Sequence, residues 1–373
     1  MTVSDVLKRE NNNLDLVRII LATMVVWSHA FQMNFGGFEQ EPMFKFLKVS
    51  SPGTLAVSAF FFVSGLLVTN SLIKKKSISK FYISRFFRLF PALAILLLIT
   101  VFVIGPIIST LPITEYFSNP QTWKYLVNNL YLNVNYQIPG CFQNNIWPVD
   151  VNSSLWSLPF EVGCYIFLLA VFTIISGHKK IANIVLISII FISIIPNQML
   201  LIFFERSYIL GLQPIACFAF GAFLAINQDD IKVDFKMMLG FTLLLLIFWR
   251  FTTIIQILFP FAISILLLLF STDKFVLKLK PKYDISYGLY IWNALIIQLI
   301  VYYFGNMNVY FLFLIAFVFT SIVSLGSYVL IENKSINFGY KLGKRVNDSK
   351  FNLERPFIYM LILMAVIILA KIL

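Results

Sequence analysis

Apolar runs of membrane-spanning length recur along nearly the whole chain, and this repetition constrains the fold more than any other feature. A helix of roughly 20 apolar residues crosses the ~30 Å hydrocarbon core of a bilayer. We place such runs near residues 14–33, 54–73, 89–110, 155–176, 181–197, 208–227, 236–251, 253–270, 285–304, 308–331 and 356–373. Only a short polar break at residues 249–250 separates two of them, so the expected count is ten or eleven.

Helices are the expected form of these runs. A backbone in lipid must satisfy its own hydrogen bonds, and the runs lack the alternating pattern of barrel strands. The sequence therefore predicts an all-α fold, a polytopic membrane helical bundle of 10–11 transmembrane helices.

The composition agrees with a membrane protein. Hydrophobic residues make up 59% of the chain and charged residues 12%, whereas soluble domains carry about 25% charged residues. This composition excludes a soluble enzyme, a disordered chain and a nucleic-acid-binding module. The net charge of +12 therefore does not indicate a nucleic-acid partner, and membrane lipid is the expected surrounding.

The cations are distributed very unequally between the two sides of the predicted bundle. Of the 29 Lys and Arg, 22 fall in segments on the side of the N-terminus, 6 fall on the other side, and Arg18 lies within the first run. Since Lys and Arg concentrate in cytoplasmic loops, we expect a cytoplasmic N-terminus.

One long segment, residues 111–154, lies on the opposite side. Long loops in compact proteins are usually functional or disordered. This segment is rich in Asn, Tyr, Trp and Pro, side chains that suit contact with a polar ligand such as a sugar. An interfacial plug without chemistry is the alternative.

The first run contains ionisable residues, which are costly in a membrane and by default indicate function. Arg18 and His29 are eleven residues apart, so they share one helix face and lie about 16 Å apart along the helix axis. Asp15, three residues before Arg18, is expected to hold the guanidinium in place. His29 would then lie in the outer half of the bilayer, where it could be catalytic or merely structural. The second histidine, His178, falls in a basic loop and is expected to be solvated.

A second polar group lies between the second and third runs. Arg85 and Arg88 are three residues apart and are followed by Pro91, so both arginines face the same way on a helix. Two guanidinium groups at the cytoplasmic mouth suit a phosphate-bearing ligand. A simple positive-inside anchor is the alternative.

The third group is at the start of the fourth run, where Glu161 follows Trp156 and Ser157. On the predicted topology Glu161 lies at the depth of His29. A carboxylate that orients an imidazole and stabilises its cation is what general-base chemistry requires. A helix-packing glutamate is the alternative.

Together these motifs resemble the acyltransferase type 3 family of integral-membrane acyltransferases, especially bacterial polysaccharide O-acetyltransferases. The matching positions run in order through residues 14–293, about three quarters of the chain. They are Arg18 and His29; Ser64 and Gly65; Arg85, Arg88 and Pro91; Asn152, Ser154, Leu155, Trp156, Leu158 and Glu161; and Ser286, Tyr287, Tyr290 and Trp292.

Two positions depart from the family pattern. Asn293 stands where the late motif usually ends in His, and an amide cannot take up a proton at neutral pH. The Pro often found after the family glutamate is absent after Glu332.

The resemblance implies a multi-pass protein of the bacterial inner (cytoplasmic) membrane, with an acyltransferase core of about ten helices in residues 1–335. Residues 336–373 would add a basic cytoplasmic loop and a further transmembrane helix. The implied donor is cytoplasmic acyl-CoA, most commonly acetyl-CoA, with no permanently bound cofactor and no metal. The implied acceptor is a sugar hydroxyl of a glycan or a lipid-linked oligosaccharide. The oligomeric state stays open.

The resemblance also implies roles for single residues. His29 and Glu161 are the expected catalytic pair. The donor is expected to contact Arg18, Ser64, Arg85 and Arg88. The acceptor is expected to contact Asn152, Trp156, Ser157 and Tyr290. Direct transfer and an acyl-histidine intermediate both remain open.

Two competing functions use the same features. A transporter or flippase of a lipid-linked glycan would also have many spans and buried charges, but no internal repeat of the transporter kind is present. A non-catalytic scaffold would tolerate substitution of Arg18, His29 and Glu161.

Overall fold

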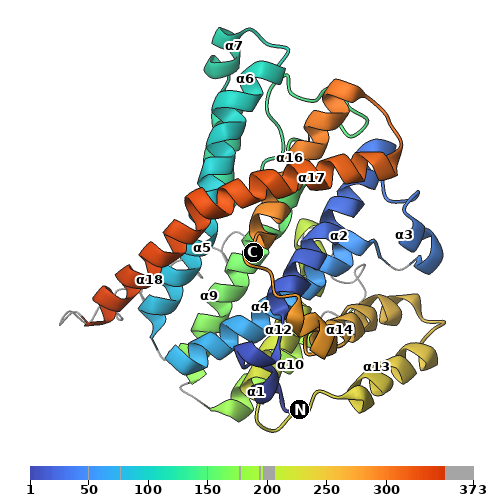
Figure 1. Ribbon diagram of the computed structural model, residues 1–373, viewed down its shortest axis with the longest axis vertical. Coiled ribbons are helices and arrows are strands. Elements are labelled where there is room, and N and C mark those ends of the chain that lie inside the picture. The colour runs from blue at the N-terminus through green and yellow to red at the C-terminus, as the bar shows by residue number, and fades with distance from the viewer. Residues whose placement is uncertain are drawn as a thin grey trace.

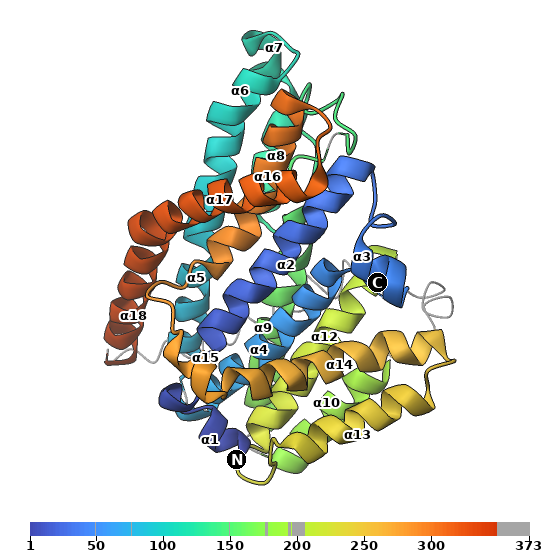
Figure 2. The same ribbon diagram turned by 45° about the vertical axis from the view of Figure 1, so that its right-hand side comes forward.

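The computed structural model describes residues 1–48, 50–75, 77–148, 150–175, 178–192, 195 and 206–348. Within these ranges the chain forms helices and connecting segments, without a β-strand (Figures 1 and 2). The α-helices are α1 (Val3–Val6), α2 (Leu14–Phe35), α3 (Pro42–Leu47), α4 (Pro52–Lys75), α5 (Ile78–Ile99), α6 (Gly105–Ile108), α7 (Ile113–Ser118), α8 (Pro120–Leu130), α9 (Leu158–Ile175), α10 (Lys179–Ile192), α12 (Arg206–Ile226), α13 (Phe235–Ile247), α14 (Thr252–Ser271), α15 (Lys274–Lys278), α16 (Ser286–Phe304), α17 (Val309–Ser327) and α18 (Asn333–Asp348). Shorter turns are η1 (Arg9–Asn11) and η3 (Ser153–Ser157), both 3-10 helices, and the π-helical η2 (Thr100–Ile104) and η4 (Tyr328–Glu332).

The predicted all-α membrane bundle is confirmed. Seven helical stretches in the described residues are long and apolar enough to cross a membrane, and Gly211–Ile226 and Phe235–Ile247 form shorter apolar helices. Each of the first ten predicted runs overlaps at least one helix of the described residues. The eleventh run, residues 356–373, lies outside the described residues, and the cytoplasmic N-terminus stays a prediction.

Helices α4 and α12 make the most extensive helix–helix contact, and two glycines allow it. A Cβ atom on Gly65 would lie 2.1 Å from the carbonyl oxygen of Phe218, and one on Gly221 would lie 2.2 Å from that of Phe62. Small residues let helix backbones approach closely in membranes, where packing rather than water exclusion holds helices together. The Gly65 of the family-like motif therefore has a packing role.

Helix α2 occupies the centre of the bundle and packs against α4, α16 and α17 (Figure 1). Its start is fixed by Asn13, whose Oδ1 accepts a hydrogen bond from the Leu16 amide at 3.1 Å. The Asn13 Nδ2 donates to the Val276 carbonyl at 2.7 Å. The cap therefore ties the beginning of α2 to α15, just before the segment that leads into α16.

The segment after α17 is helical, although residues 336–373 were predicted to begin as a cytoplasmic loop. α17 continues through η4 into α18, which packs along α5 (Figures 1 and 2). A Cβ on Gly339 would lie 2.7 Å from the Phe87 Cβ, and the rings of Phe338 and Phe87 are 5.2 Å apart. Helix α18 is amphipathic and packs one side, with Gly339 and Gly343, on α5. The cytoplasmic placement of residues 336–373 stays a prediction.

Candidate active site

The chain enters the bundle before α9 as a segment without α-helix, residues 145–148 and 150–157, which ends in the 3-10 helix η3. We call it the inserted segment. Gln298 of α16 holds the first half of this segment. The Gln298 Nε2 donates to the carbonyls of Trp147 at 2.8 Å and Asp150 at 2.6 Å. The Asn145 Nδ2 donates to the Gln298 Oε1 at 2.7 Å. A non-helical backbone inside a membrane protein needs such partners. Gln298 therefore supplies the hydrogen bonds that the backbone here cannot make within a helix.

The lower part of the inserted segment follows α16 toward its first turn. The Asn152 Nδ2 donates to the Ile291 carbonyl at 2.8 Å, and the hydroxyls of Ser157 and Tyr290 are 2.5 Å apart. From Gln298 to Tyr290 the segment descends about 12 Å along the α16 axis. Helix α9 therefore begins level with the first turn of α16.

These contacts also show where the predicted acceptor-binding residues lie. Asn152, Ser157 and Tyr290 come together, as expected for one site, but their polar groups fix the inserted segment to α16. The partly buried ring of Trp156 packs on Phe160 with centroids 6.0 Å apart. Their role in binding an acceptor stays a prediction.

His29 is almost fully buried and hydrogen-bonded to α16. Its Nδ1 is 2.5 Å from the Asn293 Oδ1. The Asn293 Nδ2 donates to the carbonyls of Tyr290 at 2.6 Å and Leu289 at 2.9 Å, and lies 3.3 Å from the Ser154 Oγ. We call His29, Asn293 and the nearby residues Asp150, Ser153 and Ser154 the His29 cluster.

The hydrogen bonds of Asn293 determine the tautomer of His29. Because the amide nitrogen is committed to donating, the atom facing the imidazole is the carbonyl oxygen, which can only accept. The His29 Nδ1 therefore carries the proton, and Nε2 keeps its lone pair. A neutral imidazole held in this tautomer can accept a proton at Nε2.

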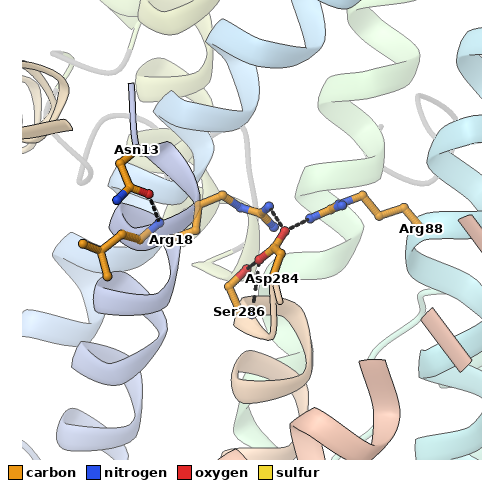
Figure 3. Close-up of polar contacts among 6 residues, drawn as sticks. Asn13, Arg18, Arg88, Asp284 and Ser286 are labelled. Carbon is orange, nitrogen blue, oxygen red and sulfur yellow. Dashed lines mark hydrogen bonds and ion pairs between the residues drawn. The ribbon is translucent and has the colours of Figure 1, made fainter. Parts of the chain in front are cut away.

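A second cluster joins three elements around one carboxylate. Arg18 of α2 and Arg88 of α5 approach Asp284 from opposite sides (Figure 3). Both guanidinium groups bind the Asp284 Oδ2, Arg88 at 2.8 Å, while the Ser286 hydroxyl donates to Oδ1 at 2.6 Å. We call Arg18, Arg88, Asp284 and Ser286 the Asp284 cluster.

The charge on Asp284 is secured by its neighbours. Burial disfavours its charged form, but the guanidinium groups of Arg18 and Arg88 outweigh burial and hold the pKa of the Asp284 carboxyl well below its usual range. The cluster therefore carries two positive charges and one negative charge. The predicted Asp15 partner of Arg18 was wrong, because Asp284 supplies the carboxylate from the segment leading into α16.

A third group surrounds Glu161. Its carboxylate accepts a hydrogen bond from the Tyr165 hydroxyl, which is also 3.1 Å from the Ser64 hydroxyl. The Arg85 guanidinium lies 5.9 Å from the centre of the Tyr165 ring. We call Ser64, Arg85, Glu161 and Tyr165 the Glu161 cluster.

The predicted pairing of Glu161 with His29 was wrong. The imidazole is held by Asn293, and the Glu161 carboxylate is held by Tyr165. Ser157 lies against Tyr290, and Glu161 follows about 6 Å further along α9, away from the level of Asn293. The reason is the inserted segment: the chain reaches this depth before α9 begins, so Glu161 lies deeper than a helix starting at the bundle surface would place it.

The shared face of Arg18 and His29 is confirmed, because both side chains contact the same stretch, residues 284–293. Eleven residues of helix separate them by about 16 Å along the α2 axis. The His29 and Asp284 clusters therefore lie about 16 Å apart along the contact between α2 and residues 284–293.

A family model described as an acyltransferase domain matches residues 11–332. The chain belongs to the acyltransferase type 3 family. It is therefore a membrane acyltransferase, and the matched region contains all three clusters.

Two relatives are similar to this acyltransferase. A protein of Shigella phage Sf6 named O-acetyl transferase is 28% identical over 335 residues, covering 87% of this chain and 96% of that protein. Nodulation protein 10 of Rhizobium leguminosarum bv. viciae is 41% identical over 83 residues, 22% of each chain. No solved structure matches this acyltransferase.

Four residues with a part in this region were not predicted from the sequence: Asp150, Tyr165 and Asp284 of the clusters, and Gln298, which holds the inserted segment. Asp284 had a usable signal, since it stands at the border between a lysine-rich segment and an apolar run, two residues before Ser286. Tyr165 also had one, since it follows Glu161 by four residues and so shares its helix face. Gln298 gave none, because its partners lie 148 to 153 positions away in the chain.

Proposed function

We propose that this protein is an integral-membrane O-acetyltransferase of the bacterial inner membrane. It transfers the acetyl group of cytoplasmic acetyl-CoA to a sugar hydroxyl of a cell-surface polysaccharide or its lipid-linked precursor. The observation that carries the proposal is the hydrogen bond between the His29 Nδ1 and Asn293, which leaves Nε2 as a base. The relative named O-acetyl transferase favours acetyl as the transferred group.

The donor binds with its phosphates at the Asp284 cluster. The side chains of Arg18 and Arg88 are 18% and 25% accessible, so both can still reach an anion. Guanidinium forks match phosphate geometry, and an excess of positive charge remains beside Asp284. The extended pantetheine arm has a length comparable to the ~16 Å axial separation of Arg18 and His29, so one donor reaches both clusters.

The chemistry at His29 is general-base catalysis. The acceptor hydroxyl gives its proton to the His29 Nε2 while its oxygen forms a bond to the acetyl carbonyl carbon. The bond between that carbon and the CoA sulfur breaks. The departing thiolate takes the proton from the imidazolium, so His29 is neutral again and the products are the acetyl ester and CoA.

The test compares glycans from cells expressing the wild type, His29→Ala or Gly163→Ala. Gly163 is a suitable control because a Cβ there meets no atom within 4 Å. Mass spectrometry measures acetyl groups on the cell-surface and lipid-linked glycans, and immunoblotting of membranes measures the amount of each protein. We expect acetylation with the wild type and the Gly163 variant, and none with His29→Ala.

Two results would contradict the proposal. Equal acetylation with His29→Ala would remove His29 as the base. A wild type that changes glycan export without adding any acyl group would favour the transporter alternative over acetyl transfer.

A further inference from the structure

Asp150 of the inserted segment carries a carboxylate oxygen without a hydrogen-bond partner. Its Oδ2 accepts hydrogen bonds from the Ser153 hydroxyl at 2.6 Å and the Trp147 Nε1 at 3.0 Å. Its Oδ1 is buried and is hydrogen-bonded to no atom of the described residues. A buried, unpaired carboxylate oxygen is costly, so this position calls for a physical explanation.

Two contacts hold the Asp150 segment close to the partner of His29. Its carbonyl accepts the Gln298 Nε2 at 2.6 Å, and four residues further on Ser154 lies against Asn293, the partner of His29. The carboxylate is close enough to His29 for the two charges to interact. The inserted segment, rather than α16, therefore supplies a carboxylate within electrostatic reach of the imidazole.

The hydrogen-bond partner of the imidazole cannot supply that charge. Asn293 is a neutral amide, so it fixes the orientation and tautomer of His29 but does not neutralise an imidazolium. Glu161, the carboxylate expected from the sequence, belongs to a different cluster and is bound by Tyr165. A buried imidazolium needs a nearby negative charge to form readily.

We propose that Asp150 stabilises the imidazolium that His29 becomes during acyl transfer. This inference rests on the proposed function, in which the His29 Nε2 takes the acceptor proton and returns it to the CoA thiolate. Asp150 itself exchanges no proton and forms no covalent bond. It is a positioning residue that acts through His29, and the orienting and charge-balancing tasks are divided between Asn293 and Asp150.

The experiment moves the carboxylate from the inserted segment to α16, where it replaces the amide at the His29 Nδ1. Full-length protein in lipid nanodiscs is assayed with acetyl-CoA and the lipid-linked glycan fraction of its host, and kcat and KM are measured for both substrates. Asp150→Asn keeps the shape of the side chain and is expected to lower kcat about 100-fold, with both KM values unchanged. The double variant Asp150→Asn with Asn293→Asp places a carboxylate at Nδ1 and is expected to recover kcat at least 10-fold over the single variant.

Gly163→Ala is the control, because Gly163 belongs to none of the three clusters and a Cβ there would meet no atom within 4 Å. We expect it to retain most of the wild-type kcat. Three results would overturn the inference: an unchanged kcat for Asp150→Asn, a rise in the acceptor KM alone, or no recovery in the double variant. A wild type that transfers no acyl group would overturn the proposed function, and this inference with it.

Discussion

The His29 Nδ1 and the Asn293 Oδ1 are 2.5 Å apart, although 264 positions separate the two residues in the chain. The pair joins the C-terminal part of α2 to the second turn of α16. Asn293 stands where the family-like motif is expected to end in His, and in the proposed mechanism its amide orients the imidazole without competing for the proton. In this mechanism Asn293 orients His29 and takes no part in the proton transfer.

This relationship predicts the effect of Asn293→Ala. The imidazole loses the acceptor that fixes its tautomer, so we expect kcat for acetyl transfer to fall about 10- to 100-fold, less than the 100- to 10,000-fold range typical of losing a general base itself. Steady-state assays on nanodisc-embedded protein measure this, with His29→Gln as the comparison. If Asn293→Ala matched the wild type in kcat, Asn293 would have no role in orienting His29.

Gln298 provides a test of the inserted segment. Gln298→Leu keeps a side chain of similar size. It removes the hydrogen bonds to Asn145, Trp147 and Asp150. Unpaired buried groups cost about 1–3 kcal/mol each, so we expect the segment to loosen and transfer to fall more than 10-fold. Limited proteolysis should reveal new cleavage within residues 145–157. A variant with full activity and wild-type protection would show that Gln298 is dispensable.

The sequence predicted what depends on local pattern. Apolar runs of about 20 residues gave the helices, and the helical period placed Arg18 and His29 on one face. Both inferences need only the residues within one helix.

The partners could not be predicted, because they come from elsewhere in the chain. Arg18 has an acid three residues away, Asp15, yet it pairs with Asp284, 266 positions distant. The predicted depth of Glu161 was also wrong, because that depth depends on the path of the chain before α9. Gln298 allows a non-helical path there by bonding to the carbonyls of Trp147 and Asp150. The residues around position 150 do not themselves predict this contact.

Arg88 allows the donor site to be tested. Arg88→Ala leaves the ion pair of Arg18 with Asp284, so the bundle should stay assembled while one phosphate-binding fork is lost. A hydrogen bond to a charged group contributes about 1.5–3 kcal/mol, so we expect KM for acetyl-CoA to rise about 10- to 100-fold with little change in kcat. Lys179→Ala is the control, because Lys179 pairs with Asp230 at an exposed position. Equal effects of both substitutions would indicate nonspecific attraction of the donor.

Asp284 predicts a pH dependence of stability. Its pKa is depressed in the folded protein, so its ion pairs contribute stability that is fully present above the unfolded pKa of about 4 and is lost as the pH falls through the folded pKa. Asp284→Asn leaves two guanidinium groups without their carboxylate and should destabilise the fold by about 3 kcal/mol. The difference from the wild type should be constant between about pH 5 and 8 and shrink only in stronger acid. Thermal unfolding in detergent measures it, and a difference that shrank near neutral pH would contradict the assignment.

The contact of α4 with α12 predicts that replacing its glycines by alanine destabilises the fold, whereas the same change at an open glycine does not. Gly65→Ala and Gly221→Ala each push a methyl group against backbone carbonyls, with Cβ–oxygen distances of 2.1 and 2.2 Å before any relaxation. Overpacking of this kind costs about 1–3 kcal/mol, and rigid backbone atoms cannot move aside as a side chain would.

Gly163 of α9 is the matched control for these two positions. A Cβ there has no neighbour within 4 Å, so Gly163→Ala should only raise helix propensity and stabilise the fold by up to about 1 kcal/mol. Thermal unfolding of the purified variants separates the two cases by the sign of the change. Since α4 carries Ser64 of the Glu161 cluster, Gly65→Ala should also lower transfer activity. Destabilisation of all three variants to the same extent would show that helix propensity, not the close approach of α4 and α12, determines the effect.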